Sequence, residues 1–186
     1  MPTCSSLKEQ MVTRTVDIRE SATHDLTEIE LLYPLAFPDE DLLPLVRDLL
    51  PDTLNVLSLI ATIGSQLAGH VVFTRSRIAE QDESAALLGP LAVSPIFQRQ
   101  GVGGALIRAG LRRLEHENVD RVFVLGDPAY YGRFGFQPGA AAMPPCPLPA
   151  EWQNAWQSLS LTGSDLSRPG RLNLPDQWLQ PSLWLP

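Results

Sequence analysis

A glycine-rich turn near the middle of the chain has the composition of an anion-binding site. Residues 98–104 have the sequence QRQGVGG and lie between an apolar run that predicts a strand and an amphipathic segment that predicts a long helix. The first amides of a helix have no intrahelical acceptor, and the helix dipole makes that end positive. Glycine lets an anion approach the backbone closely, and Arg99 adds a full charge. Residues 98–104, called the glycine turn below, therefore predict a phosphate or oxyanion site.

The glycine turn differs from two well-known nucleotide-binding patterns. It lacks the G-x-x-x-x-G-K-[ST] sequence of a P-loop and the G-x-G-x-x-G sequence of a dinucleotide site. Asp120 comes nearest to the acidic residue of a dinucleotide site, but it lies at the start of the next predicted strand rather than at its end. Glycines before a helix also occur for tight packing alone. The turn by itself therefore leaves packing and phosphate binding open.

Hydrophobic periodicity predicts the elements that position this turn. Apolar runs predict strands at 14–19, 55–63, 67–78, 85–93 and 119–125, and two more in the tail at 156–161 and 172–174. Helical spacing predicts a helix from residue 23 that Pro34 and Pro38 break, and a second from Asp39 or Asp41 that ends before Pro51. It also predicts a long helix over 101–118 and a short one over 129–134. This order predicts an α+β fold, with a mixed, mainly antiparallel sheet and helices on both faces. One parallel crossover runs through the long helix.

Two motifs in this order resemble the GNAT N-acetyltransferase superfamily. The segment 98–103, QRQGVG, resembles its [QR]-x-x-G-x-[GA] motif and follows a strand of the L-A-V-x-P type. The segment 131–136, YGRFGF, resembles its Y-x-x-x-G-F element, and the run 124–131 is similar to the YhbS-like bacterial branch. The resemblance covers about residues 14–138. It implies the GNAT fold, a splayed parallel strand pair, and acetyl-CoA-dependent transfer of an acetyl group to a primary amine.

The resemblance also implies site residues. The pyrophosphate of acetyl-CoA would be bound by Gln98, Arg99, Gln100, Gly101, Val102, Gly103 and Gly104. The backbone of Leu91, Ala92 and Val93 would pair with the pantetheine arm where a β-bulge splays the sheet, and Pro90 is compatible with such a disrupted ladder. Tyr131 would be the general acid that protonates the leaving sulfur, whereas packing beside Phe134 and Phe136 is its alternative role. Tyr130 is expected to pack.

The general base stays open. A primary amine titrates near about 10, so some group must take its proton. Six carboxylates are candidates for this role, and solvation or helix capping is the alternative role for each of them: Asp39, Glu40, Asp41, Glu80, Asp82 and Glu83. Structural roles are expected for His24, His70 and His116. Cys146 has no evident His or carboxylate partner that would make it a nucleophile.

Composition limits the partners. The 186 residues predict a single domain, 1–186, with a core at about 14–138 and a Pro-rich extension at about 139–186. The net charge of −7 argues against nucleic-acid binding and favours a neutral or cationic acceptor. Two cysteines and no ligand cluster argue against a disulfide framework and a metal. No run has membrane-spanning length and no signal peptide is evident, so the cytoplasm is the expected location.

Three function classes remain open at this point: a small-molecule amine acetyltransferase, which the sequence favours, a protein or peptide acetyltransferase, and a non-catalytic acyl-CoA sensor. The tyrosine at position 131 argues against the sensor. All four tryptophans lie in the extension, where they could bury an added lobe, line an acceptor pocket or form a homodimer surface.

Overall fold

A mixed β-sheet forms the centre of the protein. The structure, a computed structural model, describes residues 15–79, 83–139, 142–163 and 170–185. The longer strands are β1 (Val16–Glu20), β2 (Val56–Ile63), β3 (Gln66–Ile78), β4 (Ser84–Val93), β5 (Arg121–Leu125), β8 (Trp156–Ser160) and β9 (Gly170–Asn173). Strands β1 to β4 pair antiparallel in chain order, and β4 pairs with β5 in parallel. The predicted α+β class and the parallel crossover are confirmed.

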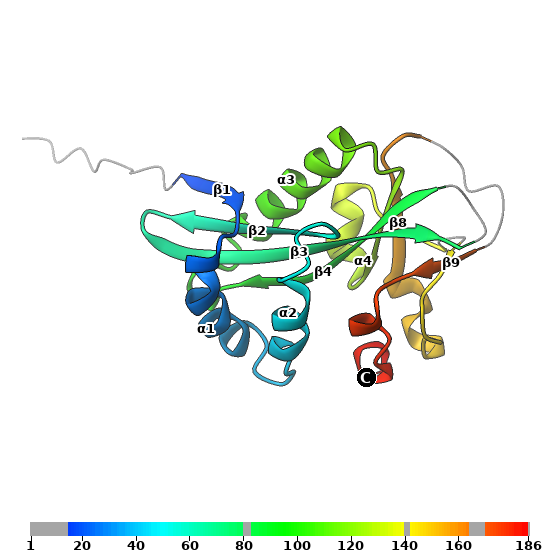
Figure 1. Ribbon diagram of the computed structural model, residues 1–186, viewed down its shortest axis with the longest axis horizontal. Helices are drawn as coiled ribbons and strands as arrows, with labels where there is room; N and C mark the ends of the chain where they lie inside the picture. Colours follow the sequence, from blue (N-terminus) through cyan, green and yellow to red (C-terminus); the bar gives the residue numbers. More distant parts are fainter. Residues whose placement is uncertain (1–14, 80–82, 140–141, 164–169, 186) are drawn as a thin grey trace, which may run out of the picture.

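Helices cover both faces of the sheet (Figure 1). The long helix α3 (Val102–His116) packs on one face, where its apolar rows bury Leu106, Ile107 and Leu114 against β2 to β5. On the other face lie α1 (Leu26–Ala36) and α2 (Leu43–Leu49). The short α4 (Pro128–Tyr131) follows β5. The predicted 3.6-residue periodicity of the long helix is thus confirmed by the residues that it buries.

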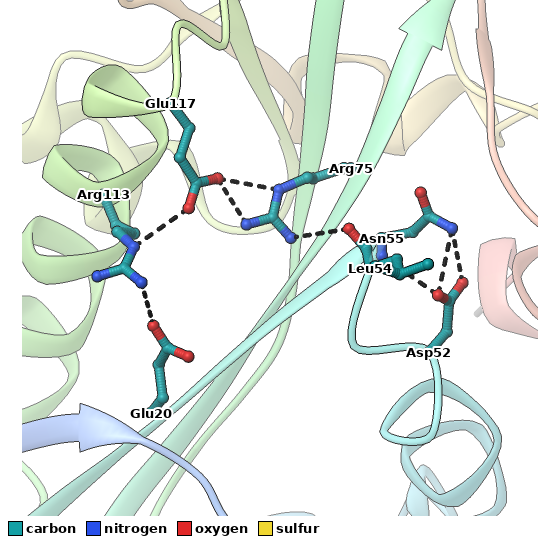
Figure 2. Close-up of polar contacts among 7 residues, drawn as sticks. All are labelled: Glu20, Asp52, Leu54, Asn55, Arg75, Arg113 and Glu117. Atoms are coloured by element: carbon teal, nitrogen blue, oxygen red, sulfur yellow. Dashed lines mark hydrogen bonds and ion pairs between the residues drawn. The ribbon is translucent and has the colours of Figure 1, made fainter.

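Ion pairs bind the C-terminal end of α3 to the sheet (Figure 2). Arg75 on β3 donates to Glu117 from Nε at 2.9 Å and from Nη2 at 2.5 Å. Arg113 pairs with the same carboxylate at 3.1 Å and reaches Glu20 on β1. The arginine on β3 also donates to the carbonyl of Leu54 at 3.5 Å. These contacts fix the far end of α3 and so help to set where its N-terminus lies.

Several predicted boundaries differ from the structure. Of the two prolines predicted to break the first helix, Pro34 lies inside α1, where it removes only one hydrogen bond of the last turns. The helix ends at Ala36, two residues before Pro38, as predicted for the second proline. The second helix begins at Leu43, later than predicted. Strand β3 begins at Gln66, since Gly64, with φ of +62°, and Ser65 suffice for the turn. Residue 14 lies outside the described residues.

Strands β4 and β5 separate halfway along β4. Their parallel pairing ends with Leu88 opposite Val124. At the same level the register between β3 and β4 shifts, so that Gly89 and Pro90 together lie opposite Val72. This is the predicted bulge, and the second half of β4 consequently has β3 on one edge and, among the described residues, no strand on the other. The predicted splayed strand pair is confirmed.

The C-terminal segment packs onto the same sheet. Strand β8 pairs antiparallel with all of β5, and β9 pairs with the end of β3. The short β7 (Ala142–Met143) pairs with β9, and β6 (Gln137–Pro138) pairs with β8. The predicted tail strand at 156–161 is confirmed to within one residue, whereas the other begins at Gly170, two residues before the predicted start.

Candidate functional site

The glycine turn presents free amides at the start of α3. The first backbone hydrogen bond of the helix runs from the amide of Ala105 to the carbonyl of Gly101 at 2.9 Å. The amides of the three preceding residues therefore have no intrahelical acceptor. Gly101 has φ of +86° and Arg99 has φ of +57°. A positive φ costs a non-glycine residue about 1 kcal/mol or more, so the backbone stores strain at the arginine of the turn.

The glycines of the turn serve different purposes. A Cβ at Gly101 would meet no atom within 4 Å, so this position needs glycine for its left-handed backbone. A Cβ at Gly103 would lie 2.6 Å from the hydroxyl of Tyr130, so here glycine makes room for a side chain. A Cβ at Gly104 would lie 3.2 Å from Arg108. Close side-chain packing is therefore a second reason for glycine at Gly103 and Gly104, besides the predicted close approach of an anion.

The second half of β4 offers an open edge of backbone. The amide of Ser94 donates to the carbonyl of Ala68 near the start of β3. Main-chain N–H and C=O groups of successive residues in an antiparallel strand point to alternate edges. Those of Ala92 therefore also face β3, while those of Leu91 and Val93 point to the open edge. One of these groups, the carbonyl of Val93, accepts a hydrogen bond from the Gln98 side chain at 3.2 Å. The others lie along the gap that the separation from β5 leaves.

A cavity of about 640 Å³ joins the open edge to the glycine turn. Of the predicted cofactor residues, those that line it are Leu91, Val93, Gln98, Arg99, Gly101, Val102, Gly103 and Gly104. Two do not. Ala92 is fully buried on the face toward α1, and the side chain of Gln100 donates to the carbonyl of Ile96 at 2.8 Å. The predicted residues thus largely surround one space.

This space, called the arginine-lined cavity below, is positively charged. The charged members of its lining are Arg99, Arg108 and Arg133, and within the described part of the chain no carboxylate lines it. The guanidinium of Arg133 lies 4.5 Å from the ring centre of Tyr130, and that of Arg108 lies 5.2 Å from that of Phe134. Sequence reasoning missed the second and third arginines and Tyr130, although Arg108 follows the last glycine by one helical turn.

Tyr131 is held by its neighbours while its hydroxyl is left free. Asp127 caps α4 by accepting from the amide of Ala129 at 2.9 Å, and its carbonyl accepts from the amide of Tyr131 at 3.0 Å. The ring packs edge-on against Tyr130 at 5.0 Å. Gly126 lies so close that a Cβ there would be 2.3 Å from the Tyr131 ring. The hydroxyl bonds to no described residue, and burial raises the pKa of Tyr131 above its ordinary value.

A second cavity, of about 760 Å³, lies on the other side of Tyr131. Its charged members are Glu40, Asp41 and Asp127, so it is called the carboxylate-lined cavity below, and no described Lys, Arg or His lines it. Most of its wall is apolar. Tyr131 lines both cavities, together with Phe37 and Leu91. Tyr131 therefore lies where a cationic and an anionic compartment meet.

The other carboxylates considered as bases have different surroundings. Glu83 accepts from Arg121 at 3.1 Å, and neither it nor Asp39 lines either cavity. Glu80 and Asp82 lie outside the described residues. Glu40 and Asp41 are exposed members of the carboxylate-lined cavity. The geometry thus brings two of the six predicted candidates to the site and adds Asp127, which the sequence did not single out.

His70 is fully buried away from both cavities. Its Nδ1 lies 2.9 Å from the hydroxyl of Tyr33, and its Nε2 lies 2.8 Å from that of Ser58. Burial lowers the pKa of His70 to about 3, so the ring is neutral near pH 7 and links α1 to the sheet. His24 and His116 are exposed, and Cys146 is half-buried beside apolar residues. The structural roles predicted for the histidines agree with these positions.

Within residues 15–79, 83–139, 142–163 and 170–185, no group of three or more His, Cys, Asp or Glu side chains could hold a metal ion. None of the helices in these ranges is both long and apolar enough to span a membrane.

Comparisons with known proteins agree with the motifs. The model of the acetyltransferase (GNAT) family matches residues 23–136. The uncharacterized N-acetyltransferase YjhQ of Escherichia coli K12 is 37% identical over 159 residues, which cover 82% of this chain and 88% of that relative. The uncharacterized N-acetyltransferase YhbS of the same strain is 34% identical over 121 residues, covering 64% of this chain and 72% of its own.

Two solved structures are similar over most of the chain. The crystal structure of Escherichia coli YhbS in complex with CoA has a TM-score of 0.78 at 29% identity and covers 89% of this chain and 92% of its own. A GNAT family acetyltransferase from Brucella melitensis in complex with acetyl-CoA has a TM-score of 0.71 at 28% identity, and the match covers 88% of this chain and 98% of that protein's chain.

Proposed function

The chain belongs to the GNAT acetyltransferase family and is an acetyl-CoA-dependent acetyltransferase, and we propose that it transfers the acetyl group directly to the primary amine of a small molecule. One observation carries this proposal: Tyr131, whose hydroxyl bonds to no described residue, lines both a cavity with arginines in its wall and a cavity with carboxylates in its wall. The first suits an anionic cosubstrate and the second a cationic acceptor.

The arginine-lined cavity fits the chemistry of CoA. We propose that the amides of the glycine turn, with Arg99, hold the pyrophosphate, and that Arg108 and Arg133 add charge for its phosphates. The open edge of β4, at Leu91 and Val93, would pair with the amides of the pantetheine arm like a missing strand. Acetyl-CoA supplies the activated acetyl thioester. Binding of this cosubstrate is supported by the similar proteins solved with CoA and acetyl-CoA.

The carboxylate-lined cavity has the size and charge for a small cationic amine. A volume of about 760 Å³ lies within the range of small-molecule sites. The exposed carboxylates attract an ammonium group to the cavity, and this attraction weakens with salt. The amine must then lose a proton, for which Glu40, Asp41 or Asp127 could act through water. We assign the base to none of them.

Tyr131 is proposed as the general acid. Because burial raises its pKa, its hydroxyl keeps its proton at neutral pH. As the amine nitrogen forms its bond to the carbonyl carbon and the carbon–sulfur bond breaks, the hydroxyl gives its proton to the departing thiolate, whose conjugate acid has a pKa of about 8.5. The nitrogen, which becomes positively charged as it bonds to carbon, loses a proton to water in the carboxylate-lined cavity, and the phenolate regains a proton from that water.

Direct transfer can be tested with purified protein, acetyl-CoA and a primary amine. We expect free thiol and N-acetylated amine to appear in equal amounts, and only when both substrates are present. The control without amine should release little thiol. Acetylation of the protein itself before the amine is added, detected by intact mass, would contradict direct transfer.

A single domain over residues 1–186, a homodimer and a cytoplasmic location stay predictions.

A further inference from the structure

The C-terminal segment forms much of the wall of the carboxylate-lined cavity. It contributes Trp152, Ala155, Trp178, Ser182, Leu183, Trp184 and Leu185. This segment lies outside residues 23–136, which the family model matches. An acceptor bound beside Tyr131 therefore touches a part of the chain that is not set by the shared GNAT core. This wall can set which acceptor the enzyme takes.

Three of the four tryptophans are engaged in holding the segment in place. The indole N–H of Trp156 donates to the carbonyl of Ala142 at 2.8 Å, and that of Trp178 to the hydroxyl of Thr74 at 3.0 Å. The indole N–H of Trp184 donates to the carbonyl of Trp178 at 2.7 Å. All three rings are at most 7% exposed. Buried indoles with satisfied N–H groups are structural.

Trp152 differs from the other three. It lies in a short 3₁₀ helix, Ala150–Ala155, and its side chain is half-buried. Its indole N–H donates to no residue that the structure describes, and its ring stacks on no other described ring. It lines the carboxylate-lined cavity all the same. An indole with one face on a cavity and a free N–H is placed to contact a ligand rather than the fold.

The wall selects an apolar acceptor body. Beyond the three carboxylates and Ser182, the lining is made of leucine, aromatic, proline, alanine and glycine residues. A polyhydroxylated amine would leave its hydroxyls without partners there, at a cost for each unmet hydrogen bond. A polyamine would bury further ammonium groups against apolar wall, because the carboxylates are all exposed. An anionic acceptor would meet only like charge.

We infer that the acceptor is a primary monoamine with an apolar aromatic body, and that Trp152 is the residue that determines this specificity by packing on that body. The inference rests on the proposed amine acetylation. The ammonium group enters past Glu40 and Asp41, and the aromatic ring lies between the indole and the leucine wall. Charge complementarity and the free indole together favour this occupant.

An amine panel tests the acceptor class. The panel holds 2-phenylethylamine and tryptamine as arylalkylamines, n-propylamine as a small amine, spermidine, glucosamine and a lysine-containing peptide. We expect kcat/KM for the arylalkylamines to exceed that for every other member by at least about tenfold. If glucosamine, spermidine or the peptide is preferred, the inference is wrong while amine acetylation stands. If no amine is acetylated although acetyl-CoA binds by calorimetry, the proposed function fails and the inference with it.

Substitution of Trp152 tests the specificity role. Trp152→Ala should lower kcat/KM for tryptamine about tenfold, mainly through KM, while changing n-propylamine turnover by less than about twofold. Trp152→Phe should restore most of the loss, because it keeps an aromatic face. Leu179→Ala is the matched control, since this tail residue is 45% exposed and lines neither cavity. Equal losses for both amines in Trp152→Ala would reduce Trp152 to a structural residue and overturn the inference.

Discussion

Gly103 and Tyr130 should be energetically coupled, because the glycine leaves room for the tyrosine hydroxyl. A Cβ at position 103 would lie 2.6 Å from that oxygen, a separation that real Cβ atoms essentially never show. The ring cannot easily move aside, since Arg133 covers it at 4.5 Å and Tyr131 packs on it at 5.0 Å. We therefore expect Gly103→Ala to destabilise the protein by about 1–2 kcal/mol, as overpacking usually does.

Removing the hydroxyl should reverse the sign of this effect. In a Tyr130→Phe background, the next contact of the added Cβ is a methyl group of Val93 at 3.4 Å, which is ordinary packing. There Gly103→Ala should be neutral or stabilise by about 0.5 kcal/mol, because alanine loses less backbone entropy than glycine. Urea unfolding of the four proteins measures the coupling, which we expect at about 1–3 kcal/mol.

Gly101→Ala is the matched control for this cycle. It meets no atom within 4 Å, and its cost of about 1 kcal/mol comes from the backbone φ of +86°. This cost should be equal with Tyr130 and with phenylalanine in its place. An equal penalty for Gly103→Ala in both backgrounds would refute the packing of Tyr130 on the start of α3.

Two further predictions concern the setting of Tyr131 and the buried histidine. Gly126→Ala places a Cβ 2.3 Å from the Tyr131 ring, so turnover should fall about 10²-fold because the hydroxyl is displaced. Gly132→Ala is the control and should change turnover little, since its Cβ would meet no atom within 4 Å. Equal turnover in the two variants would contradict the geometry. Because the pKa of His70 is lowered to about 3 in the folded protein, the unfolded state alone binds its proton below pH 6.5, so stability is full above that pH and falls as the pH drops. Urea unfolding should lose about 1.4 kcal/mol from pH 7.5 to 5.5, and His70→Gln should flatten this decline; an unchanged slope would show that another group titrates.

The sequence predicted the elements with strong periodicity and the turn between two of them. The helix over 101–118 and the strand over 119–125 were recognisable because their apolar residues pack on one face or on both. The glycine turn was recognisable because glycines before a helix let an anion approach the free amides, whereas the left-handed backbone of Gly101 was not predicted. These features depend on residues that are close in the chain, so they can be predicted from the sequence.

The acceptor side could not be predicted in the same way. The carboxylate-lined cavity joins Asp41, Asp127 and Trp152, which are far apart in the chain and meet only through the pairing of β5 with β8 and the packing of the tail. The two tail strands were predicted from their apolar runs, but the Pro-rich sequence around them has weak periodicity, so nothing indicated that the tail folds back over the cavity or that the indole N–H of Trp152 is free. Tyr130 was expected only to pack, because its contact with Gly103 depends on how α4 lies against α3.

The most direct test of the account compares Tyr131→Phe with Tyr130→Phe in single-turnover acetylation at saturating acetyl-CoA. Each change removes one hydroxyl and keeps the ring packing. The first should lower the rate of acetyl transfer by about 10²–10⁴, or about 3–5 kcal/mol of barrier, with acetyl-CoA affinity nearly unchanged. The second should cost little, since that hydroxyl lies at Gly103 and lines only the arginine-lined cavity. A near-parental rate for Tyr131→Phe would contradict the account and leave Tyr131 as a packing residue.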